Sequence, residues 1–535
     1  MRTVLTFALA ALLTAVPAFS GMAGGPPRDL DAAMRDLASS EPERQVDAAK
    51  ALAGMGARAD ASVPRLVQLL ETGTAQVRSL VHGFTTPAAE ARTALVAIGE
   101  PAVGSLLKAL RAGSPRVRAA VAEMLGEIGS ASASDALIRS LADEDRFVRQ
   151  NAAGALGRVR DPRSSPRLVA VIVDPDWVVR ANAAKSLGQI GTPEGYDPLV
   201  GALSDPMSPV RDAAAWALAE MRDRRAIGPL VDGILAWRMQ QPAVAALGKI
   251  DASASAGVLS AALRDKDPAR ATRAAWALGQ LRDPGGIDPL LAALGRPEAE
   301  VGMMAAKSLA LLGDRKAVPA LILLLSHPDA GMRTVASAAL GTLKDPAAVD
   351  PLLGHLGDGS SSVREAAIQS LGQIADPRVA GPIEPFLKDE SPSVRRTAAW
   401  SLGKVGAKRS VHLIAAILGD RDPNVRSASA LALGEMKDTR AFDPLVAALA
   451  DPAPTVRKDA AVALGSLNDP RAVDPLIATL KDSHARVRTA AAESLAAITG
   501  EKLGASPANW AAWRKEHAAS IPGDIGNNPL KGSKP

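Results

Sequence analysis

The sequence contains no cysteine, one tyrosine, six phenylalanines and seven tryptophans, so aromatic side chains make up only 3% of its 535 residues. The absence of cysteine excludes a disulfide framework, a cysteine-ligated zinc site and a thiol nucleophile. An excess of one charge is also lacking, because 62 basic residues nearly balance 57 acidic ones and leave a formal net charge of +5. A nucleic-acid-binding protein normally carries a stronger basic excess, so the composition predicts that nucleic acid is not the partner.

Long apolar runs are scarce as well, although 47% of the residues are hydrophobic. The one that stands out extends from Val4 to Val16, after Arg2 and before Pro17, and small residues that suit a cleavage site follow it. Because the run is short for a membrane span, it predicts a secretory signal peptide over residues 1–23. The alternatives are an uncleaved anchor or a buried first helix. We therefore expect a periplasmic or secreted protein, with no stable membrane insertion after the signal is cleaved.

Internal repetition is the strongest pattern in the sequence. The segment from Val148 to Gly157, with Val-Arg, Ala-Ala and Ala-Leu-Gly at fixed places, recurs along most of the chain. The numbering of its last position advances by 31 at each step, except for a step of 29 between Ala219 and Gly248. The residues at this position are Gly126, Gly157, Gly188, Ala219, Gly248, Gly279, Ala310, Gly341, Gly372, Gly403, Gly434, Gly465 and Ala496. Two looser copies precede these, so about fifteen copies are present, and such a period indicates a stack of repeats.

Each copy predicts two helices and no strand. The first helix is short and often opens with Asp-Pro, as in Asp350-Pro351, where the aspartate would be the N-cap. The second helix is expected to begin at the Val-Arg pair and to place Val456, Ala460 and Leu464 on one apolar face. Glycine inside a helix costs about 1 kcal/mol of helix propensity. We therefore expect the repeated glycine to be retained because a neighbouring backbone comes close to it.

The Val-Arg, Ala-Ala and Ala-Leu-Gly positions resemble the short HEAT-like repeats of the phycobilisome-lyase type, which many bacterial proteins contain. The resemblance covers roughly residues 30 to 500. It implies an all-α fold, an armadillo-like α-solenoid of about fifteen two-helix repeats (period 31), in which the second helices line the concave surface.

The resemblance and the composition together predict the organisation of the chain. After the signal peptide, residues 24–500 are expected to form the solenoid, and residues 501–520 are expected to cap its end through two tryptophans. Residues 521–535 are rich in Gly, Pro, Lys and Asn and predict a disordered tail. The stretch from His82 to Pro87 belongs to an insertion of about twelve residues, which we expect to protrude as a loop.

Arginine recurs at one position of the second helix, and an aspartate precedes most of these arginines by six residues. One acid for each base favours a ladder of ion pairs between repeats, as in HEAT proteins generally, over a basic track for phosphate groups. The position is lost at Gln240, Ala271 and Gly302. We expect either a local change in curvature there or a place where something else docks. The repeated arginines are Arg118, Arg149, Arg180, Arg211, Arg333, Arg364, Arg395, Arg426, Arg457 and Arg488.

Three of the seven tryptophans share a position three residues before the repeated glycine; they are Trp216, Trp276 and Trp400. Lys185 and Lys307 occupy the same position in other repeats. The helical period places this position opposite the apolar face, so we expect partly exposed anchors for a protein or peptide partner. The alternative is that the three rings fill gaps against neighbouring alanines. Trp177 and Trp237 share another position, in the turn between the two helices, where packing at the edge is expected.

The sequence contains no recognisable catalytic or metal-binding motif. None of the six histidines is followed by glutamate, so the paired His-Glu ligands of HEAT-like deoxyhypusine hydroxylases are missing. We therefore expect no cofactor, no metal and no enzymatic activity, and interpret the chain as an exported scaffold or adaptor that binds a protein or peptide through its concave face. The alternative is an accessory or lyase-like factor in cofactor attachment or envelope assembly.

Overall fold

The computed structural model describes residues 29–79 and 83–517, which are helical almost throughout. The predicted signal peptide, the predicted tail and His82 lie outside these residues. The chain divides into two compact units, one up to Met221 and one from Arg222 onward. Each unit is a stack of two-helix repeats, and fifteen second helices are present in the described ranges, six in the first unit and nine in the second. The structure thus confirms the predicted all-α solenoid.

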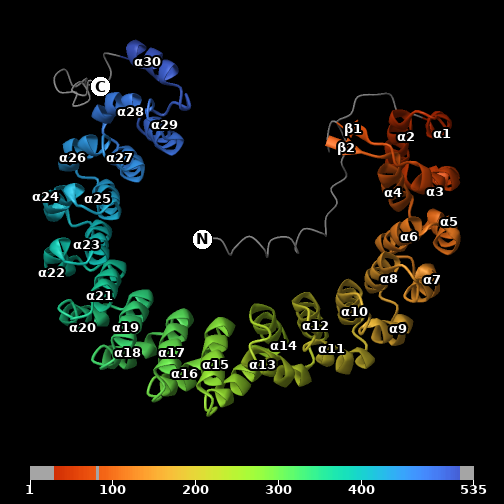
Figure 1. Ribbon diagram of the computed structural model, residues 1–535, viewed down its shortest axis with the longest axis horizontal. Helices are drawn as coiled ribbons and strands as arrows, with labels where there is room; N and C mark the ends of the chain where they lie inside the picture. The colour runs from red at the N-terminus through yellow and green to blue at the C-terminus, as the bar shows by residue number, and fades with distance from the viewer. Residues whose placement is uncertain (1–28, 80–82, 518–535) are drawn as a thin grey trace. The chain divides into compact units, whose positions relative to one another are not determined.

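In the first unit, the first and second helices of the repeats form separate layers (Figure 1). The first helices are α1 (Leu30–Leu37), α3 (Val63–Thr72), α5 (Glu100–Ala112), α7 (Ser134–Ser140), α9 (Ser165–Val171) and α11 (Tyr196–Ala202). The second helices are α2 (Pro42–Met55), α4 (Pro87–Ile98), α6 (Pro115–Ile128), α8 (Arg146–Val159), α10 (Trp177–Ile190) and α12 (Ser208–Met221). Helix α6 packs on α8, α8 on α10 and α10 on α12, so the second helices form one continuous layer.

The second unit repeats this two-layer arrangement. The first helices are α13 (Ile227–Leu235), α16 (Ile287–Ala293), α18 (Val318–Leu324), α20 (Val349–Gly354), α22 (Ala380–Ile383), α24 (Val411–Ala416), α26 (Phe442–Ala448) and α28 (Val473–Thr479). The second helices are α15 (Pro268–Leu281), α17 (Ala299–Leu312), α19 (Ala330–Leu343), α21 (Ser361–Ile374), α23 (Pro392–Val405), α25 (Pro423–Met436), α27 (Pro454–Leu467) and α29 (Ala485–Thr499). In both units, the solvent-exposed side of the second-helix layer is called the second-helix face below.

Helix α14 (Gln241–Ala262) serves two repeats at once. Its first part is a second helix, its last part is the first helix of the next repeat, and the two meet at a kink where Asp251 has φ −169° and ψ 101°. The shortened step between Ala219 and Gly248 in the sequence pattern lies before this joint, in the stretch that contains α13 and the turn into α14.

The core between the layers consists of small and branched side chains. In α27, Val456, Ala460 and Leu464 are fully buried on the face that the sequence pattern predicted. Alanine supplies a large share of the core in both units, because the second helices of adjacent repeats pack closely.

The repeated glycine lies where this packing is tightest. A Cβ atom added to Gly403 would lie 2.9 Å from the Cα of Ala432, and one added to Gly157 would lie 2.9 Å from the Cα of Ser186. Each neighbour is on the next second helix, at the same offset along the chain from its glycine. The close approach of the backbone therefore confirms the reason expected for these glycines.

The helices begin earlier than the sequence pattern predicted. A 3-10 turn, Pro346–Ala348, runs directly into α20, so Asp350 is the second residue of that helix and not its N-cap. The capping residue is Asp345, whose carboxylate accepts a hydrogen bond of 2.9 Å from the Ala347 backbone N–H. The second helices likewise start about two residues before the Val-Arg pair, as α27 does at Pro454.

The early insertion contains a short hairpin that the sequence analysis did not predict. Strands β1 (Val77–Ser79) and β2 (Gly83–Thr85) pair antiparallel, with Val77 opposite Thr85. Three residues per strand are too few for an alternating pattern to be recognised in the sequence. Phe84 is 68% exposed on this hairpin, and Pro87 begins α4.

After the last repeat, α30 (Pro507–Glu516) contacts α28. Trp510 is fully buried and donates a hydrogen bond of 2.7 Å to the Gly504 carbonyl oxygen. Arg514 donates to Asp474 on α28 at 2.8 and 3.1 Å. Trp513 lies edge-on to Trp510, with ring centres 5.6 Å apart. These contacts hold α30 against α28, which is the first helix of the last repeat.

Candidate partner-binding surface

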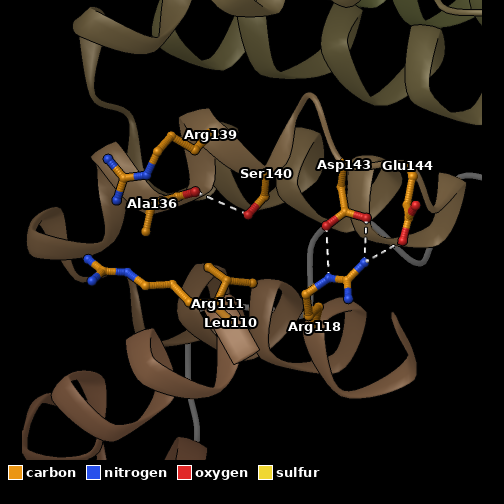
Figure 2. A pocket seen from close by; sticks show the side chains of 8 residues that line it. All are labelled: Leu110, Arg111, Arg118, Ala136, Arg139, Ser140, Asp143 and Glu144. Carbon is orange, nitrogen blue, oxygen red and sulfur yellow. Dashed lines mark hydrogen bonds and ion pairs between the residues drawn. The ribbon is translucent and has the colours of Figure 1, made fainter. Parts of the chain in front are cut away.

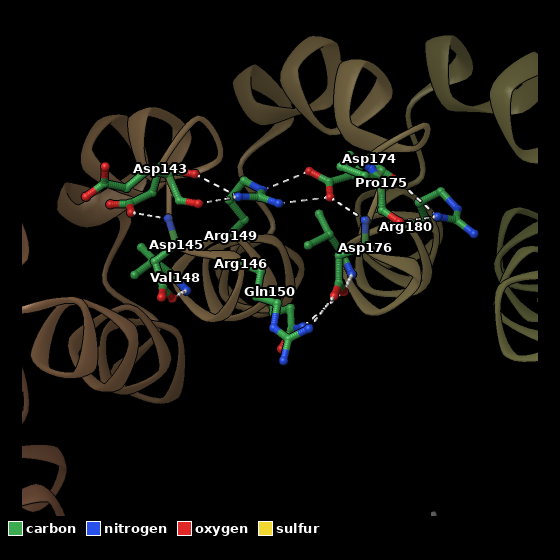
Figure 3. Close-up of polar contacts among 12 residues, drawn as sticks. Asp143, Asp145, Arg146, Val148, Arg149, Gln150, Asp174, Pro175, Asp176 and Arg180 are labelled. Carbon is green, nitrogen blue, oxygen red and sulfur yellow. Dashed lines mark hydrogen bonds and ion pairs between the residues drawn. The ribbon is translucent and has the colours of Figure 1, made fainter.

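The repeated arginines join neighbouring repeats. Arg149 on α8 donates from Nε to Asp174 Oδ2 at 2.8 Å and from Nη2 to Asp174 Oδ1 at 3.2 Å (Figure 3). Its third nitrogen, Nη1, donates to the carbonyl oxygen of Asp143 at 2.9 Å. The Asp174 carboxylate also accepts from the Asp176 backbone N–H at 2.8 Å. A single guanidinium therefore binds the turn of its own repeat and the turn of the next.

The same bidentate geometry recurs at eight places, always with an aspartate 25 residues further along. The pairs are Arg118–Asp143, Arg149–Asp174, Arg180–Asp205, Arg333–Asp358, Arg364–Asp389, Arg395–Asp420, Arg426–Asp451 and Arg457–Asp482. The hydrogen bond from Arg395 lowers the pKa of Asp420, and the hydrogen bond to Asp174 raises the pKa of Arg149. Each of these guanidinium groups is held by a carboxylate, which is the geometry of a ladder rather than of an open phosphate track.

Two further arginines at this position donate to the backbone carbonyl oxygen of the aspartate six residues earlier, as the paired arginines do. Arg211 donates from Nη1 to the Asp205 carbonyl oxygen at 2.7 Å, and Arg488 donates to that of Asp482 at 2.8 Å. The residues at the ladder offset from them are Ala236 and Trp513, which offer no carboxylate.

Where Gln240, Ala271 and Gly302 interrupt the ladder, another arginine connects the repeats. Arg296, in the turn before α17, reaches back to the carbonyl oxygens of Leu263 at 2.6 Å and Asp265 at 3.1 Å. Its Nε donates to Glu298 at 2.9 Å. This contact runs in the opposite direction along the chain and occurs once, so no repeated spacing in the sequence predicts it.

The predicted tryptophan position lies on the second-helix face. Trp216 on α12 is 40% exposed, whereas Trp276 on α15 and Trp400 on α23 are half-buried. Lys185 on α10 and Lys307 on α17 are exposed. Trp276 and Trp400, both in the second unit, do not form one cluster, because three second helices separate their repeats. Trp216 belongs to the first unit.

A second tryptophan lies against Trp276. The ring centres of Trp237 and Trp276 are 5.8 Å apart at an interplanar angle of 73°, and the Arg273 guanidinium lies 5.6 Å from the Trp237 ring centre. Trp237 lies in the turn between α13 and α14, as predicted, but its partner is on the second-helix face. Trp177, which was expected to share that turn, is instead the first residue of α10, because the second helices begin early.

An apolar row follows Trp400. Leu431 on α25 and Val462 on α27 occupy the tryptophan position in the next two repeats and are 39% and 37% exposed. Lys404, one turn after Trp400, lies with its Nζ 5.9 Å from the ring centre and pairs with Glu435 at 2.7 Å. The sequence prediction named only the tryptophans and lysines at this position, although a comparison of the position between repeats also identifies Leu431 and Val462.

A shallow pocket of about 530 Å³ lies between the ends of α5 and α7 in the first unit (Figure 2). The ladder pair of Arg118 and Asp143 forms one side, and Arg111 and Arg139 lie at the other. The Ser140 hydroxyl in this pocket donates to the Ala136 carbonyl oxygen at 3.1 Å.

Across the described residues there is no group of three or more His, Cys, Asp or Glu side chains that could hold a metal ion. The helices in these residues also include none that is long and apolar enough to span a membrane.

Layered helix pairs, the tight glycine contacts and the Arg–Asp ladder together define a helical-repeat solenoid. The HEAT-repeat family model matches residues 103–175, 165–236, 234–302, 287–372, 355–415 and 410–496. These segments cover most of the chain, so the protein belongs to the HEAT-repeat family.

Several solved structures are similar to this chain. Kap121p bound to Ste12p aligns with 91% of this chain and 65% of its own, at 13% identity and a TM-score of 0.55. Kap95p with RanGDP aligns with 92% of this chain and 74% of its own, at 14% identity and a TM-score of 0.49. The CpcE–CpcF complex of phycocyanin lyase from Nostoc sp. PCC7120 aligns with 45% of this chain and 94% of its own, at 24% identity and a TM-score of 0.31. At 13% identity, the likeness to Kap121p shows a common fold alone. No curated protein sequence matches the chain significantly.

Proposed function

We propose that this protein is an exported, non-enzymatic scaffold that holds a protein or peptide partner on its second-helix face. The observation that carries the proposal is the repeated position occupied by Trp216, Trp276, Trp400, Lys185 and Lys307. Tryptophan is enriched at protein interfaces, where a large apolar surface with one polar atom is desolvated. Aromatic residues are scarce in this protein, and their recurrence at one position of the second-helix face therefore supports a binding role.

The ladder supports the same conclusion by a different route. Because carboxylates of neighbouring repeats hold eight of the repeated arginines, these side chains are engaged in stacking the repeats. The near-neutral net charge of +5 also fits a protein partner better than nucleic acid. Solenoids commonly use one extended face for such partners.

The lyase-like alternative rests on likeness of fold. A shared fold does not imply a shared activity, and function has to be argued from a site. The tryptophan position is such a site for binding, and the scaffold is therefore the function proposed.

Export is the part of the proposal that depends on residues 1–23. Cell fractionation and N-terminal sequencing of the mature protein test it directly. We expect a periplasmic or secreted chain whose first residue lies shortly after Ser20. A cytoplasmic chain that retains Met1 would contradict export without affecting the proposed binding surface.

The binding role is tested by capture from the cell envelope with the purified protein as bait. We expect the Trp216→Ala/Trp276→Ala/Trp400→Ala variant to lose the captured partner while its circular dichroism stays helical. Trp177→Ala is the matched control, since Trp177 is also 40% exposed but lies outside the repeated position. The three single variants show which repeats contribute. Unchanged capture by the triple variant would refute the proposed surface.

A further inference from the structure

Trp237 has a backbone conformation that favours glycine. Its φ is +58°, and the hydrogen bonds Trp237 N–H to Ile234 O (2.8 Å) and Arg238 N–H to Gly233 O (3.0 Å) form a Schellman turn after α13. A bulky residue at positive φ is strained. The other non-glycine residues with positive φ in the described part of the chain each follow a second helix; they are Arg160, Arg222, Arg282, Lys344, Ala375, Lys437 and Asn468. Trp237 alone among them follows a first helix.

The Trp237 ring does not make up for this strain by burial, because 48% of the residue is exposed. One edge meets Trp276, and Arg273 approaches the ring. Arg273 is fixed in turn, because its Nη1 donates to the Leu235 carbonyl oxygen at 2.6 Å. The result is a preorganised aromatic surface with a cation beside it, and a large part of that surface faces solvent.

The second helices around this surface carry a basic excess. The first part of α14 (residues 241–250), α15 and α17 contain four basic residues and one acid; they are Lys249, Arg270, Arg273, Lys307 and Glu300. Asp265 neutralises Arg270 at 2.7 Å. Arg273 and the exposed Lys307, which lies at the Trp276 position of the next repeat, pair with no carboxylate in the described residues. The ladder is interrupted in this stretch, and no ladder aspartate pairs with Arg273 or Lys307.

Apolar surface accompanies the cations. Met303 and Met304 on α17 are half-buried and precede Lys307 by about one turn. Methionine adapts its shape to different apolar side chains, and a tryptophan pair supplies a rigid surface beside it. Both kinds of side chain suit an apolar residue of a partner that is acidic elsewhere.

We propose that Trp237, Arg273, Trp276 and Lys307 bind an acidic segment of the partner protein that carries aromatic or leucine side chains. This inference rests on the proposed function and specifies where on the second-helix face the partner is anchored and which chemistry it presents. The partner's carboxylates pair with Arg273 and Lys307, and its apolar side chains cover the exposed Trp237 ring.

The test uses the full-length protein and three labelled peptides of about twelve residues. The first alternates Glu with Leu and Phe, the second replaces each Glu by Lys, and the third replaces Leu and Phe by Ser. Fluorescence anisotropy gives the affinities, and quenching of tryptophan emission gives an independent readout. We expect the first peptide to bind at least about tenfold more tightly than the other two.

Two variants test the assigned residues. Trp237→Gly removes the ring and the backbone strain together, so the fold should be retained, and Arg273→Gln keeps a donor for the Leu235 carbonyl oxygen. We expect each variant to bind the acidic peptide about tenfold more weakly. The control variants Trp177→Gly and Lys481→Gln should bind it with unchanged affinity. Equal binding of the Glu and Lys peptides, or unchanged affinity of both variants, would overturn the inference.

The envelope-captured partner separates this inference from the proposed function. If the triple tryptophan variant loses that partner but Trp237→Gly and Arg273→Gln retain it at full affinity, the scaffold role stands and the assigned anchor is wrong. If the triple variant retains the partner as well, the proposed surface itself is wrong.

Discussion

Arg364 binds both carboxylate oxygens of Asp389, 25 residues further along the chain, from Nε at 2.8 Å and Nη2 at 2.9 Å. Both side chains are at least nine-tenths buried. The third nitrogen of Arg364 donates to the Asp358 carbonyl oxygen at 2.9 Å, and Asp358 is itself the partner of Arg333. Three successive repeats are therefore connected through two side-chain pairs, and loss of one arginine leaves a buried carboxylate without its main counter-charge.

Replacing the most buried arginine of the ladder is expected to cause the largest loss of stability. Arg395→Ala removes the partner of Asp420, whose side chain is 10% exposed, and we expect a loss of about 3 kcal/mol in unfolding free energy. Urea unfolding monitored by circular dichroism measures it. The control is Arg471→Ala, because Arg471 is 43% exposed and pairs with Asp469 of its own turn. A ladder variant as stable as this control would show that the ladder does not stabilise the stack.

Replacing either of two glycines in α8 by alanine is expected to change the stability in opposite directions. Gly157→Ala places a Cβ 2.9 Å from the Ser186 Cα, so overpacking should cost about 1–3 kcal/mol. Gly154→Ala in the same helix meets nothing closer than 3.7 Å and should gain about 0.5–1 kcal/mol from helix propensity. Thermal unfolding of both variants provides an internally matched comparison. Stabilisation by both alanines would contradict the close approach at Gly157.

Acid is expected to destabilise the 3-10 turns that precede the first helices. Arg163 lowers the pKa of Asp161 to about 2, and Arg440 lowers the pKa of Asp438 to about 2. Because these folded-state values lie below the ordinary 3.8, the contribution to stability is complete above about pH 4 and is lost as the pH falls toward about 2. The midpoint of urea unfolding should fall less steeply between pH 5 and pH 2 in the Asp161→Asn/Asp438→Asn variant than in the unchanged protein. Identical dependence of the midpoint on pH in the two proteins would refute this assignment.

The final helix is expected to protect the last repeat. Trp510 is fully buried, so Trp510→Ala should cost about 3–5 kcal/mol locally and release α30 from α28. Hydrogen exchange would then accelerate in α28 and α29, while the middle repeats of the second unit exchange as before. Lys515→Ala, an exposed change in α30, serves as the control. Unaltered exchange in α28 after loss of Trp510 would show that α30 is not a cap.

The repetitive part of this fold could be predicted because the same contact occurs in many copies of the repeat. The position of Gly157 occurs thirteen times in the sequence, and its small residues predicted a close neighbouring backbone. The structure confirms that backbone at Gly157. The same redundancy placed Val456, Ala460 and Leu464 in the core. Helix starts such as Asp345 were missed because both Asp345-Pro346 and Asp350-Pro351 have the sequence of a helix start, and only the geometry of the 3-10 turn selects between them.

Features that occur once were beyond the sequence pattern. The contact of Trp237 with Trp276 joins residues at a spacing found nowhere in the ladder. The backward reach of Arg296 and the hairpin at Val77 are also single events. Each depends on local geometry that no second copy could reveal, and the candidate anchor of the partner lies among these irregular features.

The constant offset of the ladder also determines how the number of repeats can change. Removing residues 334–364, which amounts to one full period, would join Arg333 to Glu365 and bring Asp389 to the distance along the chain that Asp358 now has. All donors and acceptors at the new junction would still be matched, as would the glycine and its neighbour. Unequal recombination within the regular stretches can thus add or delete whole repeats without mismatched contacts, whereas the shorter step before Gly248 does not allow such an exchange.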